Sequence, residues 1–309
     1  MTIYSSVTHL VGNTPLVRIN SLSRNAHAHV IAKAEFFNPA SSVKDRIAVA
    51  IVDAAEQSGQ LKPGGTIVEA TSGNTGVGLA MVGAARGYRV VITMPESMSQ
   101  ERRMLMRAFG AELVLTPASQ GMKGTVEAAR SLVENDPNAV WARQFENTAN
   151  PAIHRLSTAQ EIWDDTNGAI DVFIAGIGTG GTISGVGAFL KEKNPDIRVI
   201  GIEPEESPLM TQGKAGPHAI QGIGANFVPS NYDPTVVDEV ITIKGSDALE
   251  YARRAAREEG LFVGISSGAN LAGALSIARR QEMEDKTIVT VLPDTGERYL
   301  STPLYSTQD

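Results

Sequence analysis

Short runs of β-branched residues alternate with longer amphipathic runs along most of this 309-residue sequence. Runs such as TIVEA (66–70) and RVVITMP (89–95) are typical of buried strands, and the segments between such runs carry apolar residues at helical spacing. This alternation is the pattern of a mostly parallel sheet covered by helices on both faces. It predicts an α/β fold built from two doubly wound, three-layer domains.

The same pattern predicts individual elements. In the first half we expect a helix that ends at Gly87, a helix capped by Ser97 or Ser99 that runs through Phe109, a strand at AELVLTP, and a helix from about Thr125 to Glu134. In the second half we expect strands at 171–176, 197–204, 236–243 and 287–293, with helices after the 176–182 loop, at 246–259 and after LFVGISSGA.

The regular pattern breaks at ENDPN (134–138) and at the polar ENTANPAIH (146–154). A chain of 309 residues is also long for one compact core. We therefore expect two domains, 1–150 and 151–309.

Composition narrows the classes of partner. The formal net charge is -7 and the pI is about 5.4, so no basic excess exists to bind nucleic acid or an anionic membrane. The absence of cysteine excludes disulfides, thiolate metal sites and a cysteine nucleophile. The sequence shows no leader pattern and no apolar stretch of the length a membrane helix needs, so a cytoplasmic protein that acts on small molecules is expected.

The glycine-rich loop GIGTGGT (176–182) follows a predicted strand and precedes a predicted helix. Glycines let the backbone approach an anion closely, and the start of the helix offers backbone N–H groups. Thr179 and Thr182 add hydroxyl donors. This loop is a candidate phosphate site, and the alternative is a tight turn that binds nothing.

The same loop also satisfies the dinucleotide pattern G-x-G-x-x-G through Gly176, Gly178 and Gly181. Glu203 ends a second predicted strand at about the distance where such proteins place a ribose-binding acid. A dehydrogenase is therefore one interpretation of this half of the chain.

Two further loops carry clustered hydroxyl groups. TSGNTG (71–76) lies at a predicted helix start and suits a carboxylate, although these residue types are common in ordinary capped turns. GISSGA (264–269) contains G-x-S-x-G around Ser266, the pattern of a hydrolase nucleophile elbow, with a structural cap as the alternative. A hydrolase also needs a histidine in a strand-end context, and none of the five histidines has one: His9, His27, His29, His154 and His218.

Neither is a metal site expected from these histidines. His27 and His29 could share a strand face, but no third ligand is evident. Both are read as surface residues.

Lys44 lies in the segment ASSVKDRIAV, where Ser42 and Asp45 form a capping pattern at a helix start. The positive end of the helix dipole disfavours an ammonium group there, and a lysine with more neutral amine suits Schiff-base chemistry. The alternative is an ordinary solvated charge. An activated lysine, a phosphate loop and a carboxylate loop are together the requirements of pyridoxal phosphate acting on an amino acid.

The sequence resembles the fold-type II pyridoxal-phosphate enzymes, whose fold is that of tryptophan synthase β, and within them the O-acetylserine sulfhydrylase (cysteine synthase) family. Nine segments carry the resemblance, in family order from residue 11 to 303: VGNTPLVRI, EFFNPASSVKDRI, EATSGNTGVGLAMV, TMPESMSQERR, QFENTANPAIH, GIGTGGTISGVG, IQGIGANFVP, GISSGAN and LPDTGERYLST. Each segment is weakly specific alone, and the ordered set is highly specific.

The resemblance implies a role for each matched residue. Lys44 would bond the cofactor and later act as the base, and Asn74 would contact the phenolic oxygen of the ring. Ser266 would contact the pyridine nitrogen. The phosphate would be bound by Gly178, Thr179, Gly180, Gly181 and Thr182. The substrate carboxylate would be bound by Thr71, Ser72, Asn74, Thr75 and Gln144, with Gly222 in a closing loop. The Schiff-base lysine and the substrate loop thus fall in 1–150 and the phosphate loop in 151–309, and the first 35 residues or so are free to pack on the second domain.

The implied reaction converts O-acetyl-L-serine and sulfide to L-cysteine and acetate through an aminoacrylate intermediate. A neutral serine at the pyridine nitrogen would make the ring a weaker electron sink, which favours rapid loss of a β substituent. Asp294 is the rival for that position, and it would reverse the argument.

The resemblance also implies a homodimer and a complex with serine acetyltransferase, whose C-terminal tail would enter the cleft. A cystathionine β-synthase or a serine dehydratase remains the alternative within the same family. The preferred sulfur donor is not evident from the sequence.

Overall fold

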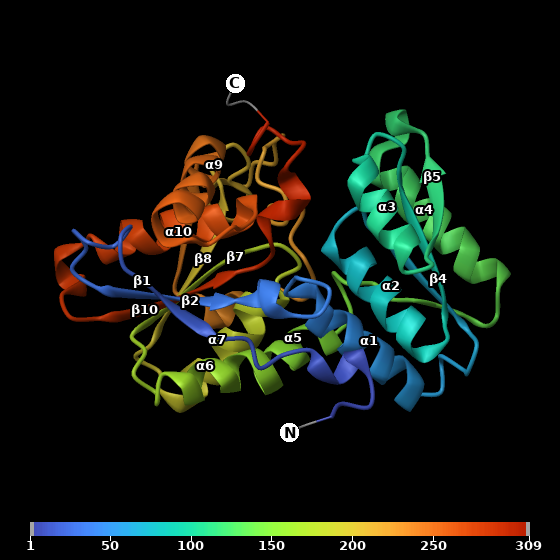
Figure 1. The fold of residues 1–309 in the computed structure, drawn as a ribbon, viewed down its shortest axis with the longest axis horizontal. Helices are drawn as coiled ribbons and strands as arrows, with labels where there is room; N and C mark the ends of the chain where they lie inside the picture. Colours follow the sequence, from blue (N-terminus) through green and yellow to red (C-terminus); the bar gives the residue numbers. More distant parts are fainter. Residues whose placement is uncertain (1–2, 307–309) are drawn as a thin grey trace. The chain divides into compact units, whose positions relative to one another are not determined.

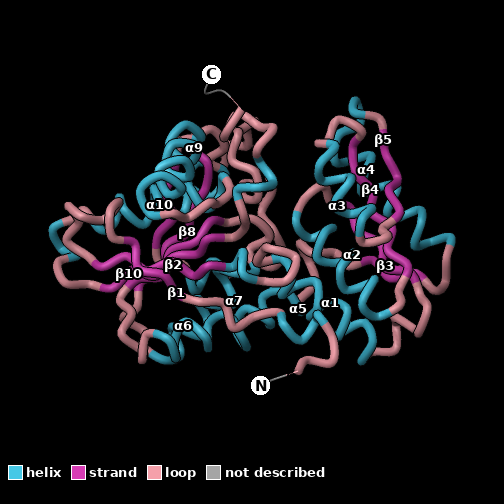
Figure 2. The backbone as a smooth tube through the Cα atoms, viewed as in Figure 1, coloured by secondary structure: helices cyan, strands magenta, loops and turns pink. Residues whose placement is uncertain are grey.

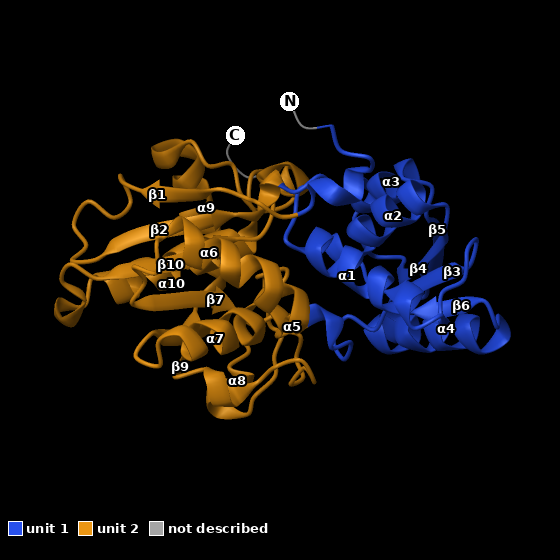
Figure 3. Ribbon diagram, turned by 90° about the horizontal axis from the view of Figure 1, so that it is seen from below, with its two compact units in different colours: residues 1–11, 38–150 blue, residues 12–37, 151–309 orange. Residues whose placement is uncertain are grey.

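The computed structural model describes residues 3–306, which form two compact units (Figure 3). Unit 1 contains the chain up to Val11 together with Asn38–Asn150. Unit 2 contains Gly12–Phe37 and the chain from Pro151 onward. The early segment Gly12–Phe37 is therefore part of unit 2, although it precedes most of unit 1.

Unit 1 is built on a parallel sheet of four strands in the order β5-β4-β3-β6. The strands are β3 (Thr66–Ala70), β4 (Arg89–Pro95), β5 (Glu112–Thr116) and β6 (Ala139–Trp141). The helices are α1 (Lys44–Gln57), α2 (Asn74–Arg86), α3 (Gln100–Ala108) and α4 (Gly121–Asn135). α5 (Ala149–Ile153) contains the passage of the chain from unit 1 to unit 2.

Helices cover both faces of this sheet. Val68 and Ala70 of β3 pack with Ala129 of α4 on one face. The neighbouring strand turns Val90 to the opposite face, where a Cβ at Gly83 of α2 would collide with it. Only glycine at 83 lets α2 lie so close to the sheet. The result is the predicted three-layer arrangement (Figures 1 and 2).

Unit 2 has a six-stranded sheet in the order β1-β2-β10-β7-β8-β9. The strands are β1 (Leu16–Ile19), β2 (His29–Ala34), β7 (Val172–Gly176), β8 (Arg198–Pro204), β9 (Glu239–Ile243) and β10 (Thr287–Leu292). The helices are α6 (Ala159–Asp165), α7 (Gly181–Lys193), α8 (Leu209–Gln212), α9 (Gly245–Arg254) and α10 (Ile265–Ala278). All strand pairs are parallel except β1 with β2, so the predicted mostly parallel α/β fold is confirmed.

The sheet of unit 2 separates two apolar cores. Ile174, Ile202 and Leu271 belong to the core on the α10 side. Phe173 and Leu190 belong to the core on the α7 side. Adjacent residues of β7 face opposite cores because side chains alternate along a strand.

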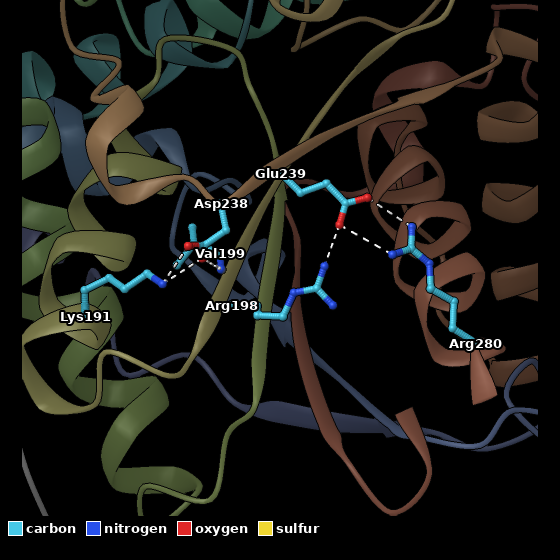
Figure 4. A network of polar contacts seen from close by, with 6 residues as sticks. All are labelled: Lys191, Arg198, Val199, Asp238, Glu239 and Arg280. Carbon is cyan, nitrogen blue, oxygen red and sulfur yellow. Dashed lines mark hydrogen bonds and ion pairs between the residues drawn. The ribbon is translucent and has the colours of Figure 1, made fainter. Parts of the chain in front are cut away.

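A polar network ties the edge strand β9 to β8 and to the end of α10 (Figure 4). The Glu239 carboxylate accepts hydrogen bonds from Arg198 at 2.7 Å and Arg280 at 3.1 Å. Beside it, Asp238 accepts from Lys191 and, at 2.7 Å, from the backbone N–H of Val199. These contacts fix the register of an edge strand that has only one hydrogen-bonded neighbour.

Several predicted boundaries are confirmed. β3 and β4 occupy the predicted residues, α2 ends at Gly87 with φ 77°, and the Ser99 hydroxyl caps α3. No helix among residues 3–306 combines the length and the apolar character needed to span a membrane.

Other boundaries were predicted wrongly. α4 begins at Gly121 rather than near Thr125. β9 begins at Glu239 because a 3-10 turn, Pro234–Val236, takes the preceding residues. By contrast, the helix predicted at 246–259 has the expected extent, since α9 (Gly245–Arg254) continues as a π-helical turn, Ala255–Glu259.

Candidate active site

The strand order of unit 1 reverses at β3, since β4 and β5 lie on one side of it and β6 lies on the other. Ligands of open α/β sheets bind at the carboxyl ends of the strands beside such a reversal. The loop after β3 begins with Thr71 and Ser72, and the loop after β6 contains Gln144. The predicted carboxylate-binding residues therefore lie at the ligand-binding edge of this sheet.

Hydrogen bonds join the two loops at this edge. The Thr75 hydroxyl, in the first turn of α2, donates to Oε1 of Gln144 at 2.6 Å, and both side chains are buried. The Thr71 hydroxyl accepts from the backbone N–H of Gly73 at 3.2 Å, and the Ser72 carbonyl accepts from Arg102 at 3.4 Å. The structure thus brings Thr71, Thr75 and Gln144 together around the start of α2.

Lys44 is the first residue of α1 and is half-buried. The predicted capping pattern was wrong in detail: the helix starts one residue later, with Val43 at the N-cap position, and Ser42 and Asp45 make other hydrogen bonds. The Ser42 hydroxyl accepts from the Lys44 N–H at 3.2 Å. The Asp45 carboxylate accepts from the Ala40 N–H at 2.6 Å and from the Ser42 hydroxyl at 3.3 Å. These bonds fix the backbone from which the lysine side chain extends.

Close packing of two helices brings Asn74 near the start of α1. A Cβ at Gly78 of α2 would lie 3.0 Å from Cβ of Ala48 and 3.2 Å from the carbonyl oxygen of Lys44. Asn74 is four residues before Gly78 and shares its face of the helix. Asn74 and Lys44 therefore belong to neighbouring helix starts in unit 1.

Unit 2 has its own reversal of strand order at β7, which lies between β8 and β10. The glycine-rich loop 176–182 follows β7 and leads into the thirteen-residue helix α7. Gly180 has φ 83°, and a Cβ there would lie 2.7 Å from the backbone nitrogen of Tyr232. A Cβ at Gly178 would collide with the carbonyl oxygen of Gly222. Only glycine permits this close-packed loop at the start of a helix, as the phosphate-site prediction requires.

The loop also approaches the start of α10. A Cβ at Gly222, where φ is 99°, would lie 3.4 Å from the Ser266 hydroxyl oxygen. Ser266 is 3% exposed and lies in the first turn of α10. Gly178, Gly222 and Ser266 therefore form one group of neighbours in unit 2.

Asp294 lies against Gly264, the N-cap residue of α10, and is engaged there by a neighbouring tyrosine. Its Oδ2 accepts from the Tyr299 hydroxyl at 2.6 Å, and its Oδ1 packs so closely on Gly264 that a Cβ there would collide with it. Ser266 and Asp294 therefore both lie beside the start of α10, and one carboxylate oxygen of Asp294 is engaged by Tyr299.

Two residues of unit 2 contact the candidate phosphate loop or the strand before it, and neither of them has a role predicted from the sequence. His154 lies with its Nε2 3.2 Å from the Thr182 hydroxyl of the phosphate loop and its Nδ1 2.9 Å from the Thr158 hydroxyl. Asn270 donates to the Val291 carbonyl and accepts from the Gly176 N–H, both at 2.8 Å, so it joins the ends of β10 and β7. The contacts of His154 with Thr182 and of Asn270 with Val291 and Gly176 link residues distant in sequence, so no local pattern indicates them.

The acidic residue that the dehydrogenase interpretation requires, Glu203, is engaged in other hydrogen bonds. The Glu203 carboxylate, which a dinucleotide would need, accepts from the Met210 and Thr211 N–H groups at 2.7 and 3.0 Å and from the Thr211 hydroxyl at 2.6 Å. His27 and His29 are exposed, as predicted.

Glu69, at the end of β3, is a further residue that the sequence analysis used only as part of a strand. Its side chain is 2% exposed, and burial raises its pKa from 4.5 to about 7 against the lowering effect of hydrogen bonds from Gln144, Arg143 and Trp141. An acidic residue in a run that is otherwise apolar and β-branched was the available signal.

The raised pKa of Glu69 predicts a pH-dependent stability. The unfolded carboxyl group ionises near pH 4.5 and the folded one near 7, so the folded state retains an extra proton between these values. The stabilisation is complete below 4.5 and is lost as pH rises through 7. Urea unfolding at several pH values should show the wild type losing about 2 to 3 kcal/mol relative to Glu69→Gln between pH 5 and pH 8. Parallel pH profiles for the two proteins would contradict this assignment.

Comparison with known proteins defines the class. A family model described as pyridoxal-phosphate dependent enzyme matches residues 7–294. The chain is 50% identical over 305 residues to a cysteine synthase of Staphylococcus aureus (strain Mu50 / ATCC 700699), covering 98% of each protein. The chain belongs to the pyridoxal-phosphate dependent enzyme family.

Two crystal structures are similar over all of this chain. One is a cysteine synthase from Entamoeba histolytica, with a TM-score of 0.96, 46% identity and 92% of that chain covered. The other is an O-ureido-L-serine synthase, with a TM-score of 0.96, 47% identity and 97% of that chain covered. The fold is thus shared by relatives with different products.

The residues present fit pyridoxal phosphate. Unit 1 offers a lysine amine at the ordered start of α1, and unit 2 offers a glycine loop at a helix start, with two positions where any side chain would collide with backbone. The buried Ser266 hydroxyl suits a neutral ring nitrogen.

Proposed function

We propose that this protein is a cysteine synthase, which converts O-acetyl-L-serine and sulfide to L-cysteine and acetate in the last step of cysteine biosynthesis. The observation that carries the proposal is the 50% identity to a cysteine synthase over nearly the whole chain. The placement of the candidate residues at the ligand-binding edges of both sheets supports it.

Lys44 would hold the cofactor through its side-chain amine. Pyridoxal phosphate, when bound, withdraws electrons from the α carbon of an amino acid, so that the α proton and a β substituent become able to leave. The amine of Lys44 would act as the base that takes the α proton and returns it once sulfide has added to the β carbon. Acetate leaves with the electron pair of the bond to the β carbon.

The other cofactor contacts follow from the two groups of residues. The N–H groups and hydroxyls of Gly178, Thr179, Gly180, Gly181 and Thr182 would bind the phosphate at the start of α7. Asn74 would donate to the phenolic oxygen of the ring. The neutral hydroxyl of Ser266 would face the pyridine nitrogen and keep the ring a moderate electron sink.

The substrate carboxylate would lie at the start of α2. It would be bound by backbone and side-chain donors of Thr71, Ser72, Asn74, Thr75 and Gln144, of which Thr75, in the first turn of the helix, and Gln144 are joined by a hydrogen bond. A helix start favours a negative charge. Gly222, with φ 99°, would give the loop beside it the freedom to close over the substrate.

Product analysis tests the reaction. Purified protein supplied with pyridoxal phosphate, O-acetylserine and sulfide should form cysteine and acetate in equal amounts. Formation of cystathionine from serine and homocysteine, or of pyruvate and ammonia from serine, with no cysteine from the first mixture, would favour the alternative cystathionine β-synthase or serine dehydratase.

We also propose that the protein acts in the cytoplasm as a homodimer. The exposed apolar side chains of Ile3, Tyr4, Val7 and Leu10 support a subunit contact. Sedimentation at the mass of one 32.7 kDa chain would count against it.

Serine acetyltransferase is the proposed protein partner. The carboxylate of its C-terminal tail would bind at the start of α2 as a substrate carboxylate does. Inhibition by a tail peptide should therefore weaken as O-acetylserine rises, and inhibition that is independent of O-acetylserine would refute the shared site.

A further inference from the structure

We propose that Glu69 is a positioning residue that orients Gln144, and through it Thr75, for the carboxylate of the amino-acid substrate. This inference rests on the proposed function, which assigns Gln144 and Thr75 to that carboxylate.

The Glu69 side chain connects β3 to the loop that follows β6, its neighbour on the side opposite β4. It lies at the end of β3, and its two carboxylate oxygens accept from consecutive N–H groups in the loop after β6. One oxygen accepts from Arg143 at 2.8 Å and the other from Gln144 at 3.4 Å. One carboxylate therefore sets both the position and the rotation of this piece of backbone.

The loop needs such an anchor. Arg143 has φ 51°, a left-handed conformation that residues with a Cβ adopt at a cost in energy. Asn150 holds the other side of the loop by donating to the Gln144 carbonyl at 2.8 Å. With its backbone fixed at both ends, the Gln144 side chain is aimed at Thr75, whose hydroxyl donates to it at 2.6 Å.

A purely structural role would not require an ionisable group here. Glu69 is buried on the face of the sheet that α2 covers, because its register partner on β4 is Ile92, two residues from Val90. The groups that offset its burial are hydrogen-bond donors of residues 141–144. A buried carboxylate held only by such donors lowers stability, and a neutral side chain would be less costly. What the carboxylate provides is acceptance of two adjacent N–H bonds.

A double-mutant cycle at pH 8 tests the inference. Glu69→Gln retains one acceptor oxygen but turns an amide N–H₂ toward the other N–H group. We expect the KM for O-acetylserine to rise about tenfold, the effect of losing one hydrogen bond to a charged group. We expect kcat and the KM for sulfide to change less than about twofold, since only substrate binding is altered.

The same substitution should have little effect once Gln144 is absent. In a Gln144→Ala background, adding Glu69→Gln should change the KM for O-acetylserine less than about twofold, because Glu69 acts through Gln144. Independent, multiplying effects of the two substitutions would overturn the inference.

Thr93→Val is the matched control. Thr93 is fully buried in the adjacent strand, and its hydroxyl donates to the Thr125 carbonyl at 2.9 Å and to the Glu69 backbone carbonyl at 3.5 Å. Its replacement thus removes polar contacts beside Glu69 while leaving the carboxylate and its two bonds to residues 143 and 144 in place. It should lose stability and keep the wild-type KM for both substrates. A tenfold rise in KM for this control would contradict our inference, because it would mean that the loss of any buried polar group in the sheet has the same effect.

Wild-type protein that forms no cysteine would refute both the function and the inference, whereas active wild type with an unchanged KM in Glu69→Gln would refute the inference alone.

Discussion

Replacing Lys44 with alanine should lower kcat for cysteine formation by about 10³-fold or more. The substitution removes both the amine that bonds the cofactor and the base that moves the α proton, and a positioned base alone contributes about 10² to 10⁴ in rate. The backbone at the start of α1 should persist, because Ser42 and Asp45 accept hydrogen bonds from backbone N–H groups independently of the lysine side chain. Steady-state kinetics and circular dichroism check the two expectations.

Lys62→Ala is the matched control in the same unit. Lys62 is exposed on the surface of unit 1 and has no proposed role. This variant should keep wild-type activity. Retention of more than a tenth of the wild-type kcat by Lys44→Ala would contradict the assigned role of Lys44.

The second large effect is expected at Gly180. In Gly180→Ala the new Cβ would meet the backbone nitrogen of Tyr232 at 2.7 Å, and the residue would be forced into a left-handed conformation. The loop must move, and the phosphate contacts at the start of α7 move with it. We expect the dissociation constant for pyridoxal phosphate to rise about 100-fold, the equivalent of about 2.7 kcal/mol. Fluorescence titration of the cofactor-free protein measures it.

Gly213→Ala separates backbone strain from collision. Gly213 has φ 68° and ends α8, and nothing lies within 4 Å of a Cβ placed there. This variant should show a modest loss of stability and wild-type cofactor affinity. Equal losses of affinity in the two variants would show that general destabilisation, and not the shape of the phosphate loop, is responsible.

Local sequence patterns predicted those elements whose determinants are local. β3 and β4 are rich in β-branched residues, and α2 ends where Gly87 adopts a left-handed conformation. The pairing of β1 with β2 was not predicted. β1 is a four-residue strand, and its partner is identified by contacts in the folded sheet.

The candidate site likewise combines loops that local sequence predicts with contacts that it does not predict. The loops at 71–76 and 176–182 could be found from composition, because hydroxyl and glycine residues gather at strand ends. The bond between Thr75 and Gln144 spans 69 residues, and the bond between Glu69 and the Gln144 N–H spans 75. Both depend on β6 adding beside β3, on the side opposite β4. That strand order is a property of the packed sheet, so the sequence alone marks Glu69 only as one more strand residue.

The most direct measurement is the location of the covalent bond between the protein and its cofactor. The protein loaded with pyridoxal phosphate is reduced with borohydride, digested, and analysed by peptide mass spectrometry. A phosphopyridoxyl group on Lys44 is the predicted result. Stable modification of a different lysine, or of none, would contradict the account.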